Sequence, residues 1–269
     1  MAIDPDDGLS VMEVGAWSED KHALIRRFVH ASWAARTRWS QRTYVDLFCG
    51  PGKILVRGNN EIKDGSPIVA WKESSRHGGA FTDVFIADLD SDSVSACESR
   101  LRSLGAPVRP FLGEAAVTVD QVLPFLRQRG LHLVLLDPFS MGVLDFSILQ
   151  KLARLKHVDI VLHFSVMDLQ RNIDGEYTKT GGLLERFAPN WRNHVQVHDT
   201  NKEGARNAYL DYWISLAQSL GFRVHIRAPL FTNSNNGPLY RLVLLYRNDL
   251  PGKLWNDVAK PQGQKDFGF

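Results

Sequence analysis

Short apolar runs alternate with amphipathic helical patterns along most of this chain, and this alternation restricts its fold more than any other feature. Five runs occur in order, at residues 44–48, 84–87, 108–112, 131–136 and 158–164. Helical patterns lie before and between them, at residues 19–36, 93–104, 118–129 and 145–156. Strands that alternate with helices predict a parallel sheet with crossover helices. Runs that are apolar nearly throughout are typical of strands covered on both faces.

The last third of the chain departs from this alternation. A helical pattern at residues 205–220 precedes two strand-like runs, Arg223–Ala228 and Tyr240–Tyr246. Only the turn-rich segment Asn233–Pro238 separates these runs, so they can pair antiparallel. We therefore predict an α/β fold, with a Rossmann-like, seven-stranded, mostly parallel sheet and helices on both faces. No linker rich in Pro, Gly or Ser divides the chain, so we expect a single domain over residues 17–269 and a loose leader over 1–16.

Charge does not decide whether this chain binds nucleic acid. Lys and Arg number 32 and Asp and Glu 30, which gives a formal net charge of +2. The densest basic stretch holds seven residues: Lys21, Arg26, Arg27, His30, Arg36, Arg38 and Arg42. Such a stretch is either a solvated helix face or a nucleic-acid site, and the first interpretation is the simpler one.

Two cysteines, Cys49 and Cys97, do not make a disulfide framework or a four-cysteine zinc site. Met1–Asp7 is acidic and polar, unlike a signal peptide. No apolar run approaches the ~20 residues that a membrane span needs. We therefore predict a cytoplasmic protein without a membrane partner.

Polar residues follow four successive predicted strands. Asp46 lies near the end of the first strand, before Gly50 and Gly52, and Asp88 ends the second. Gly113-Glu114 follows the third strand, and Asp137-Pro-Phe-Ser140 follows the fourth. Ligands of open parallel sheets bind beyond the carboxyl ends of the strands. Any one of these positions alone would indicate only a tight turn or a loop carboxylate. Together, the four positions are predicted to share one rim of the sheet.

The glycine loop does not match the common phosphate-binding motifs. It lacks the third glycine of the dinucleotide fingerprint, and Gly52-Lys53 is followed by Ile54 where a P-loop has Ser or Thr. Its stretch Tyr44–Gly52 instead resembles the first motif of class I S-adenosylmethionine (SAM)-dependent methyltransferases. The seven predicted strands, with an antiparallel pair last, resemble the sheet of that class.

The chain more narrowly resembles the three-Cys-motif partner family of bacteria, over nearly its whole length. Asp137-Pro-Phe139 and Met167–Asn172 are the more specific parts of the resemblance. It also includes Trp17–Lys21, Gly65–Pro67, Leu136–Phe139, His163–Asn172, Leu239–Leu242 and Pro251–Trp255. The family is named for genes that lie beside a protein with a three-cysteine motif. The resemblance implies a methyltransferase-like protein that acts with such a partner, on an acceptor that it does not identify.

SAM is the cofactor that the resemblance implies, and it also implies residue roles. The Gly50–Gly52 loop would wrap the methionine portion, Asp88 would hold the ribose, and Glu114 would lie near the adenine. The predicted cofactor-binding residues are Asp46, Phe48, Gly50, Gly52, Asp88, Leu89 and Glu114. The predicted catalytic residues are Asp137, Pro138 and Phe139. The alternative is a non-catalytic adaptor, or a nucleic-acid-processing partner, that keeps the methyltransferase fold.

The Asp137-Pro-Phe139 stretch resembles the Asp/Asn-Pro-Pro-Tyr/Phe motif of amino-directed nucleic-acid methyltransferases, but it lacks the second proline. Phe139 therefore either stacks on an acceptor base or packs under the rim. Asp-Leu-Phe-Cys49-Gly also occurs in cytosine-5 methyltransferases, but the Pro-Cys of that class is missing here, so Cys49 is predicted to be a small buried residue behind the loop.

The end of the fifth predicted strand leaves two interpretations open. His163, Asp168, Arg171 and Asn172 face the substrate side of the rim, or Asp168 and Arg171 pair with each other at i, i+3. No spacing of His, Asp or Glu predicts a metal site. His22, His30, His194 and His198 are expected at the surface.

Overall fold

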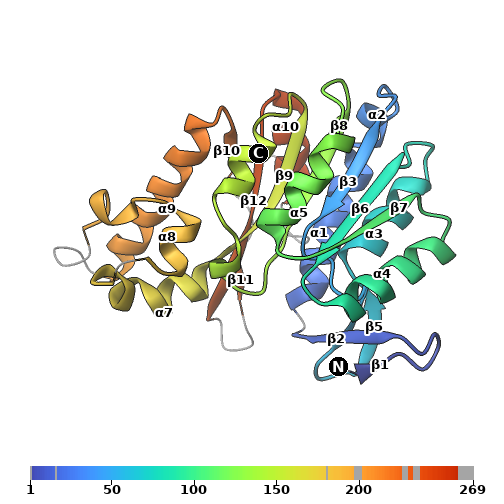
Figure 1. Cartoon of the computed structure of the whole chain (residues 1–269), viewed down its shortest axis with the longest axis horizontal. Coiled ribbons are helices and arrows are strands. Elements are labelled where there is room, and N and C mark those ends of the chain that lie inside the picture. Colours follow the sequence, from blue (N-terminus) through green and yellow to red (C-terminus); the bar gives the residue numbers. More distant parts are fainter. Residues whose placement is uncertain are drawn as a thin grey trace, which may run out of the picture.

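A computed structural model of the chain describes residues 2–15, 17–179, 181–196, 202–225, 230–232 and 237–259. Its main sheet has the strand order β10-β12-β9-β8-β3-β6-β7, and β11 also pairs with β12 (Figure 1). The strands are β3 (Arg42–Asp46), β6 (Asp83–Asp88), β7 (Val108–Leu112), β8 (Leu131–Leu136), β9 (Val158–Ser165), β10 (Arg223–His225), β11 (Leu230–Thr232) and β12 (Pro238–Tyr246). The first five of these are parallel, as the alternation predicts.

The prediction of seven mostly parallel strands needs a correction. The main sheet has eight strands of mixed orientation, because Leu230–Thr232 adds β11 beside β12. Strand β12 runs antiparallel to β9 as well as to β10 and β11. The expected antiparallel pair is present over Arg223–His225, whereas residues 226–229 and 233–236 of the predicted strand and loop lie outside the described residues.

Helices cover both faces of the main sheet, as predicted. One face packs against α1 (Trp17–Ala31), α3 (Ser66–Ser75), α4 (Ser91–Ser103) and α10 (Asp249–Val258). The other face packs against α5 (Ala115–Val122), α6 (Ser147–Leu152), α7 (Val166–Tyr177), α8 (Leu183–Phe187) and α9 (Lys202–Ser219). A short helix, α2 (Trp33–Arg36), and three 3₁₀ turns, at Leu123–Phe125, Met141–Val143 and Trp191–Asn193, complete the described helices.

Alternate residues of the central strands enter different cores. Tyr44 of β3 joins the core under α1 and α3, and its neighbour Val45 joins the core under α5 and α6. In β8, Leu133 likewise joins the core under α1 and α3, and Val134 joins the core under α5 and α6. Successive side chains of a strand point to opposite faces, so a strand buried on both sides must be apolar at consecutive positions.

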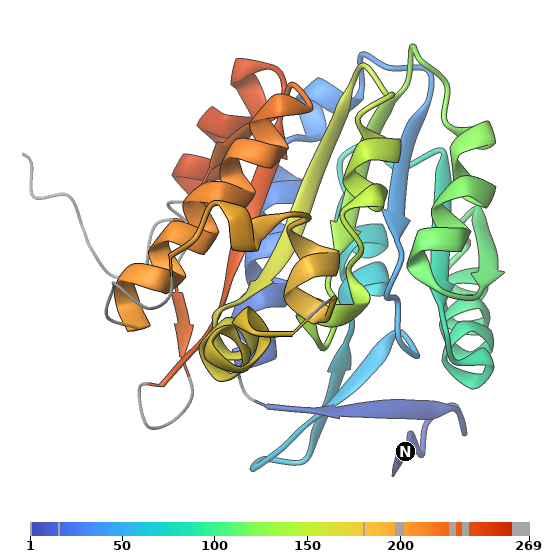
Figure 2. The ribbon, with the colours of Figure 1, turned by 60° about the vertical axis from the view of Figure 1, so that its left-hand side comes forward.

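A second sheet crosses the end of the main sheet, and the sequence analysis did not predict it. Its strands are β1 (Ala2–Ile3), β2 (Ser10–Val14), β4 (Lys53–Val56) and β5 (Glu61–Asp64), in the order β1-β2-β4-β5. Figures 1 and 2 show it below the end at which β3 finishes. Residues 2–3 and 10–14 of the segment expected to be a loose leader form strands of this sheet, and β2 pairs in parallel with β4. The turn-forming Gly58-Asn-Asn60 between apolar residues was the available signal for the β4–β5 hairpin.

Arg100 of α4 ties this second sheet to the glycine loop. Its side chain is 4% exposed and binds the Asp7 carboxylate through two hydrogen bonds of 2.8 Å. The same guanidinium donates to the carbonyl oxygens of Ser10, at 2.8 Å, and Pro51, at 2.7 Å. One buried cation thereby joins α4 to two segments that are distant from it in sequence, residues 7–10 and the glycine loop at Pro51.

Among the described residues, no helix combines the length and the apolar character that a membrane crossing requires.

Arg100→Met should lower the free energy of unfolding by about 3 kcal/mol, because it removes two charged hydrogen bonds from the Asp7 carboxylate and one from each of two carbonyl oxygens. Arg102→Met on the same helix is the matched control. Arg102 is 59% exposed and pairs with Glu98, so its loss should change stability by less than about 0.5 kcal/mol. Urea unfolding of both variants measures the difference, and equal effects would contradict the role given to Arg100.

Candidate functional site

The candidate site lies where the order of the main sheet reverses. From β3 the chain continues to β6 and β7 on one side, and then to β8 and β9 on the other. Asp46, Asp88 and Asp137 stand at or just after the ends of β3, β6 and β8. Because these strands are parallel neighbours, the three carboxylates share one rim. This reversal is the place at which open α/β sheets bind their ligands.

The glycine loop is held to the end of β6 by Asp88. The Gly50 N–H donates to Asp88 Oδ2 at 2.9 Å, and the Asp90 N–H donates to Oδ1 at 3.1 Å. Gly50 and Gly52 have φ values of 53° and 83°, in the left-handed region that residues with a Cβ rarely adopt. Asp88 is half-buried, so it positions this loop while part of its carboxylate stays accessible.

After the glycine loop the chain forms the β4–β5 hairpin, and a contact between Gly65 and Gly52 then brings it back beside the loop. The Gly65 N–H donates to the Gly52 carbonyl oxygen at 2.7 Å. A Cβ on Gly65 would lie 2.8 Å from that oxygen, closer than real Cβ contacts. Gly65 therefore allows α3 to start directly beside the loop, with Pro67 in its first turn.

Asp46 is fully buried behind the loop. Its carboxylate accepts hydrogen bonds from the Ser66 hydroxyl at 2.8 Å, the Tyr44 hydroxyl at 3.0 Å and the Phe48 N–H at 3.1 Å. Burial raises the pKa of Asp46 to about 7, the hydrogen bonds from Ser66 and Phe48 oppose that shift, and the negative charge of Asp137 adds to it. Asp46 therefore supports the loop from the inside, and it titrates near neutral pH.

Asp137 is held by a charged partner and by an imidazole. Lys21 Nζ forms an ion pair with Oδ2, and His163 Nδ1 lies 2.9 Å from Oδ1. Burial alone would raise the pKa of Asp137, but the Lys21 charge and the His163 hydrogen bond outweigh it and hold that pKa well below its usual range. The ring of Tyr240 lies 4.2 Å from the His163 ring, and its hydroxyl donates to the Trp17 carbonyl oxygen.

The other predicted site residues have varied environments. Phe48 is half-buried and packs on the core, Pro138 is buried, and Leu89 is 70% exposed. Glu114 is exposed at the start of α5. Phe139 is 88% exposed, so the interpretation that it packs under the rim is wrong. Cys49 is buried and free, as predicted.

Residues after β9 stabilise the neighbouring loop. Asp168 Oδ2 accepts a hydrogen bond from the Met141 N–H at 2.8 Å, and Asn172 donates to the Asp168 carbonyl oxygen. Asp168 thus anchors the 3₁₀ turn that follows Asp137-Pro-Phe139. A hollow of about 480 Å³ lies beyond this turn, lined by Gly142, Gly181, Gly182, Leu183, Glu185 and Arg186. It contains none of the predicted cofactor residues.

Much of the basic stretch is used inside the fold. Arg36 is 3% exposed and donates to the Gly79 carbonyl oxygen. Arg42 donates to the carbonyl oxygens of Ala80 and Trp39, and Lys21 is paired with Asp137. The interpretation of this stretch as one solvated face is therefore wrong, and a nucleic-acid site that uses all seven residues is excluded as well.

Histidine placement also needs correction. His22 is buried, and burial together with the Lys21 charge lowers its pKa to about 3, so it is not a surface histidine. His194 is exposed, as expected, and stacks on Tyr212. His198 lies outside the described residues.

Sequence reasoning missed Lys21, Ser66 and Tyr240 as parts of the site. Lys21 and Asp137 are 116 positions apart, so no local pattern joins them. The Trp17–Lys21 and Gly65–Pro67 stretches were the available signals for Lys21 and Ser66, because both belong to the resemblance described above.

Comparison with solved structures places this geometry in a known fold. Protein LPL1258 from Legionella pneumophila is 9% identical, with a TM-score of 0.51 over 90% of this chain and 93% of its own. The carbon methyltransferase DszA is 14% identical, with a TM-score of 0.52 over 86% of this chain. This chain spans only 55% of DszA. An O-methyltransferase from Bacillus cereus, solved in complex with SAH, is 10% identical, with a TM-score of 0.48, and covers 86% of this chain and 82% of its own.

No family model matches the chain, and no curated protein is significantly similar to it. At such low identities the structural similarity concerns the fold alone. The chain has a methyltransferase-like fold.

Asp46→Asn should remove a pH dependence of stability. Because the folded chain raises the pKa of this carboxyl from 3.8 to about 7, the folded state binds its proton more tightly than the unfolded state. The contribution of Asp46 to the free energy of unfolding therefore decreases as the pH rises from about 4 to about 7.

Asn cannot lose a proton, so the stability of Asp46→Asn relative to the wild type should increase over this range, at up to ~1.4 kcal/mol per pH unit. Urea unfolding at several pH values measures it. The exposed Asp92→Asn on α4 is the control, and a difference that does not vary with pH would exclude the buried-carboxyl explanation.

Proposed function

We propose that this chain is a SAM-dependent methyltransferase whose cofactor lies at the rim formed by the ends of β3, β6 and β8. The observation that carries the proposal is the 2.9 Å hydrogen bond from the Gly50 N–H to Asp88. It holds a left-handed glycine turn beside an acidic residue at the reversal point of the sheet, where such folds bind nucleotide-like ligands. The fold shared with DszA supports the same assignment.

The residues at this rim fit SAM in chemistry. Gly50 lets a ligand approach the backbone, since only the flexible end of Met12 comes near, 3.1 Å from where a Cβ on Gly50 would be. A Cβ on Gly52, in contrast, would meet Cys97 and Ile68. Each Asp88 oxygen has a lone pair beyond the one used in its backbone hydrogen bond, and ribose hydroxyls can donate to it. The positive sulfonium suits a rim that carries the half-buried carboxylate of Asp88.

In this proposal the Gly50–Gly52 loop contacts the methionine portion, Asp88 binds the ribose, and Glu114 lies near the adenine. Phe48 and the exposed Leu89 flank the two ends of the cofactor. Asp46 acts from behind the loop through the Phe48 N–H. Each role agrees with the strand end on which the residue lies.

Bound SAM would supply an electrophilic methyl carbon, and the chain would align the acceptor with it. Asp137 stays a carboxylate because Lys21 and His163 lower its pKa. His163 Nδ1–H therefore donates to Asp137, which leaves Nε2 as the ring nitrogen that can take a proton from an acceptor. The exposed Phe139 can stack on a planar acceptor.

The resemblance to the three-Cys-motif partner family supports a finer proposal, in which the enzyme acts with a protein that carries a three-cysteine motif. Phe139 favours a planar acceptor, and a nucleic-acid base is one such group. A second candidate function is a non-catalytic adaptor with the same fold. One observation favours it, since both oxygens of Asp137 are already bound by Lys21 and His163.

Asp88→Ala should weaken binding of S-adenosylhomocysteine by ~10-fold to ~150-fold, because a charged hydrogen-bond acceptor is lost and the Gly50 loop loses its partner. Titration calorimetry measures the affinity. Asp90→Ala is the matched control, since Asp90 caps α4 through Ser93 and faces no predicted ligand group. Wild-type protein that binds no cofactor, even at millimolar concentration, would favour the adaptor.

Asp137→Asn should reduce methyl transfer by ~100-fold or more and change cofactor affinity little, because an amide does not orient the His163 ring as the carboxylate does. The assay follows labelled methyl groups from SAM into RNA, DNA or protein. Lys21→Met is the comparison, since it keeps the Asp137–His163 contact. Full transfer by Asp137→Asn, or parallel losses of cofactor affinity and melting temperature, would show that Asp137 only supports the loop.

A further inference from the structure

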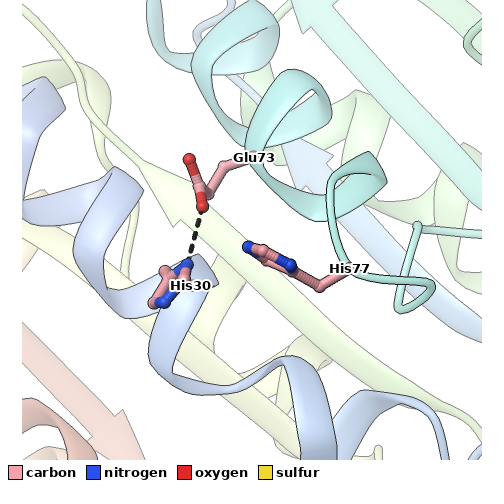
Figure 3. Close-up of side chains that lie close together, drawn as sticks. All are labelled: His30, Glu73 and His77. Atoms are coloured by element: carbon pink, nitrogen blue, oxygen red, sulfur yellow. Dashed lines mark hydrogen bonds and ion pairs between the residues drawn. The ribbon is translucent and has the colours of Figure 1, made fainter.

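Three side chains that can ligate a metal converge where α1 and α3 end, outside the candidate site. His30 lies in the last turn of α1, Glu73 in the last turn of α3, and His77 two residues beyond α3. One ligand atom from each lies within 4.8 Å of the other two. Figure 3 shows both imidazole rings beside the Glu73 carboxylate, with one His77 nitrogen turned toward it. Lys21, which contacts the rim, lies at the other end of α1.

The spacing of these atoms is close to that of a coordination shell. His30 Nδ1 and Glu73 Oε1 are 2.8 Å apart, and the two imidazole ring centres are 5.1 Å apart. Two ligands at ~2.0–2.1 Å from a tetrahedral Zn²⁺ lie about 3.3 Å from each other. An ion would therefore separate His30 from Glu73 slightly and draw His77 inward. Both histidines can adjust, because the His30 side chain is 54% exposed and His77 is exposed.

The surroundings of this cluster favour a cation. The Glu73 side chain is only 4% exposed, so its carboxylate is fixed in place between the two helices. His30 and Glu73 lie in the last turns of α1 and α3, and helix carboxyl ends carry partial negative charge. Arg76 Nη1 lies 3.0 Å from Glu73 Oε2 and occupies the second oxygen, which leaves Oε1 for the ion.

We propose that His30, Glu73 and His77 form a binding site for a divalent transition-metal ion, with Zn²⁺ the best match. Two imidazoles and one carboxylate are ligands that Zn²⁺ takes readily, whereas Mg²⁺ and Ca²⁺ prefer oxygen ligands alone. Three protein ligands leave the remaining position to water. The site joins α1 to α3 at the end of the molecule away from the glycine loop, so its ion would stabilise helix packing without taking part in chemistry at the rim.

Calorimetric titration of the full chain with Zn²⁺ tests this proposal. The wild type should bind one ion per chain, and its melting temperature should rise as Zn²⁺ is added. His30→Ala and His77→Ala should each weaken binding at least ~tenfold, and Glu73→Gln should weaken it while keeping the shape of the side chain. Arg76→Ala should tighten binding, because it removes a cation that competes for Glu73.

His194→Ala is the matched control, since it removes an exposed, ring-stacked histidine outside the cluster. It should leave the affinity for Zn²⁺ unchanged. Circular dichroism of each variant checks that it is folded, which is expected for His77→Ala because the side chain is exposed. Absence of binding by the wild type, or wild-type affinity in His77→Ala, would overturn the proposal. The second result would place the ion elsewhere, for instance at Cys49 and Cys97.

Discussion

The hydrogen bond from the Gly50 N–H to Asp88 joins the two parts of the fold on which the candidate site depends. It fixes the loop after β3 to the end of β6, at the point where the strand order reverses. The loop must then turn sharply, since β4 of the second sheet starts at Lys53 and α3 starts beside the loop after Gly65. Glycine at these positions is a steric requirement, because a Cβ would meet backbone or force a strained φ.

Electrostatics at the rim separates the behaviour of two neighbouring carboxylates. Asp46 is buried among neutral hydroxyls and one N–H, and its pKa rises to about 7. Asp137 is less deeply buried, with 11% of its side chain exposed, and Lys21 and His163 supply positive charge or a donor, so its pKa falls. Many acid–base sites contain two carboxyl groups whose surroundings shift their pKa values in opposite directions. Here the difference leaves one charged residue facing outward and one that titrates behind the loop.

Most of the main sheet could be predicted from the sequence, and much of the rim with it. The strands ending in Asp46, Asp88 and Leu136 are apolar at consecutive positions because both faces are covered. Parallel neighbours end on one side, so polar residues after them had to share a rim. The second sheet was missed because β1, β2, β4 and β5 are short, and because its central pair, β2 and β4, lies far apart in the chain.

By itself, the sequence determined the α/β class, the five parallel strands in alternating order, and the glycine turn beside Asp46 and Asp88. These features follow from local periodicity and from the conformational freedom of glycine, which neighbouring residues control. Only the tertiary structure decided that Lys21 and His163 engage Asp137, that Phe139 faces solvent, and that His30, Glu73 and His77 meet. Those contacts join helices and strands whose separation in the chain leaves no periodic signal, because packing alone brings them together.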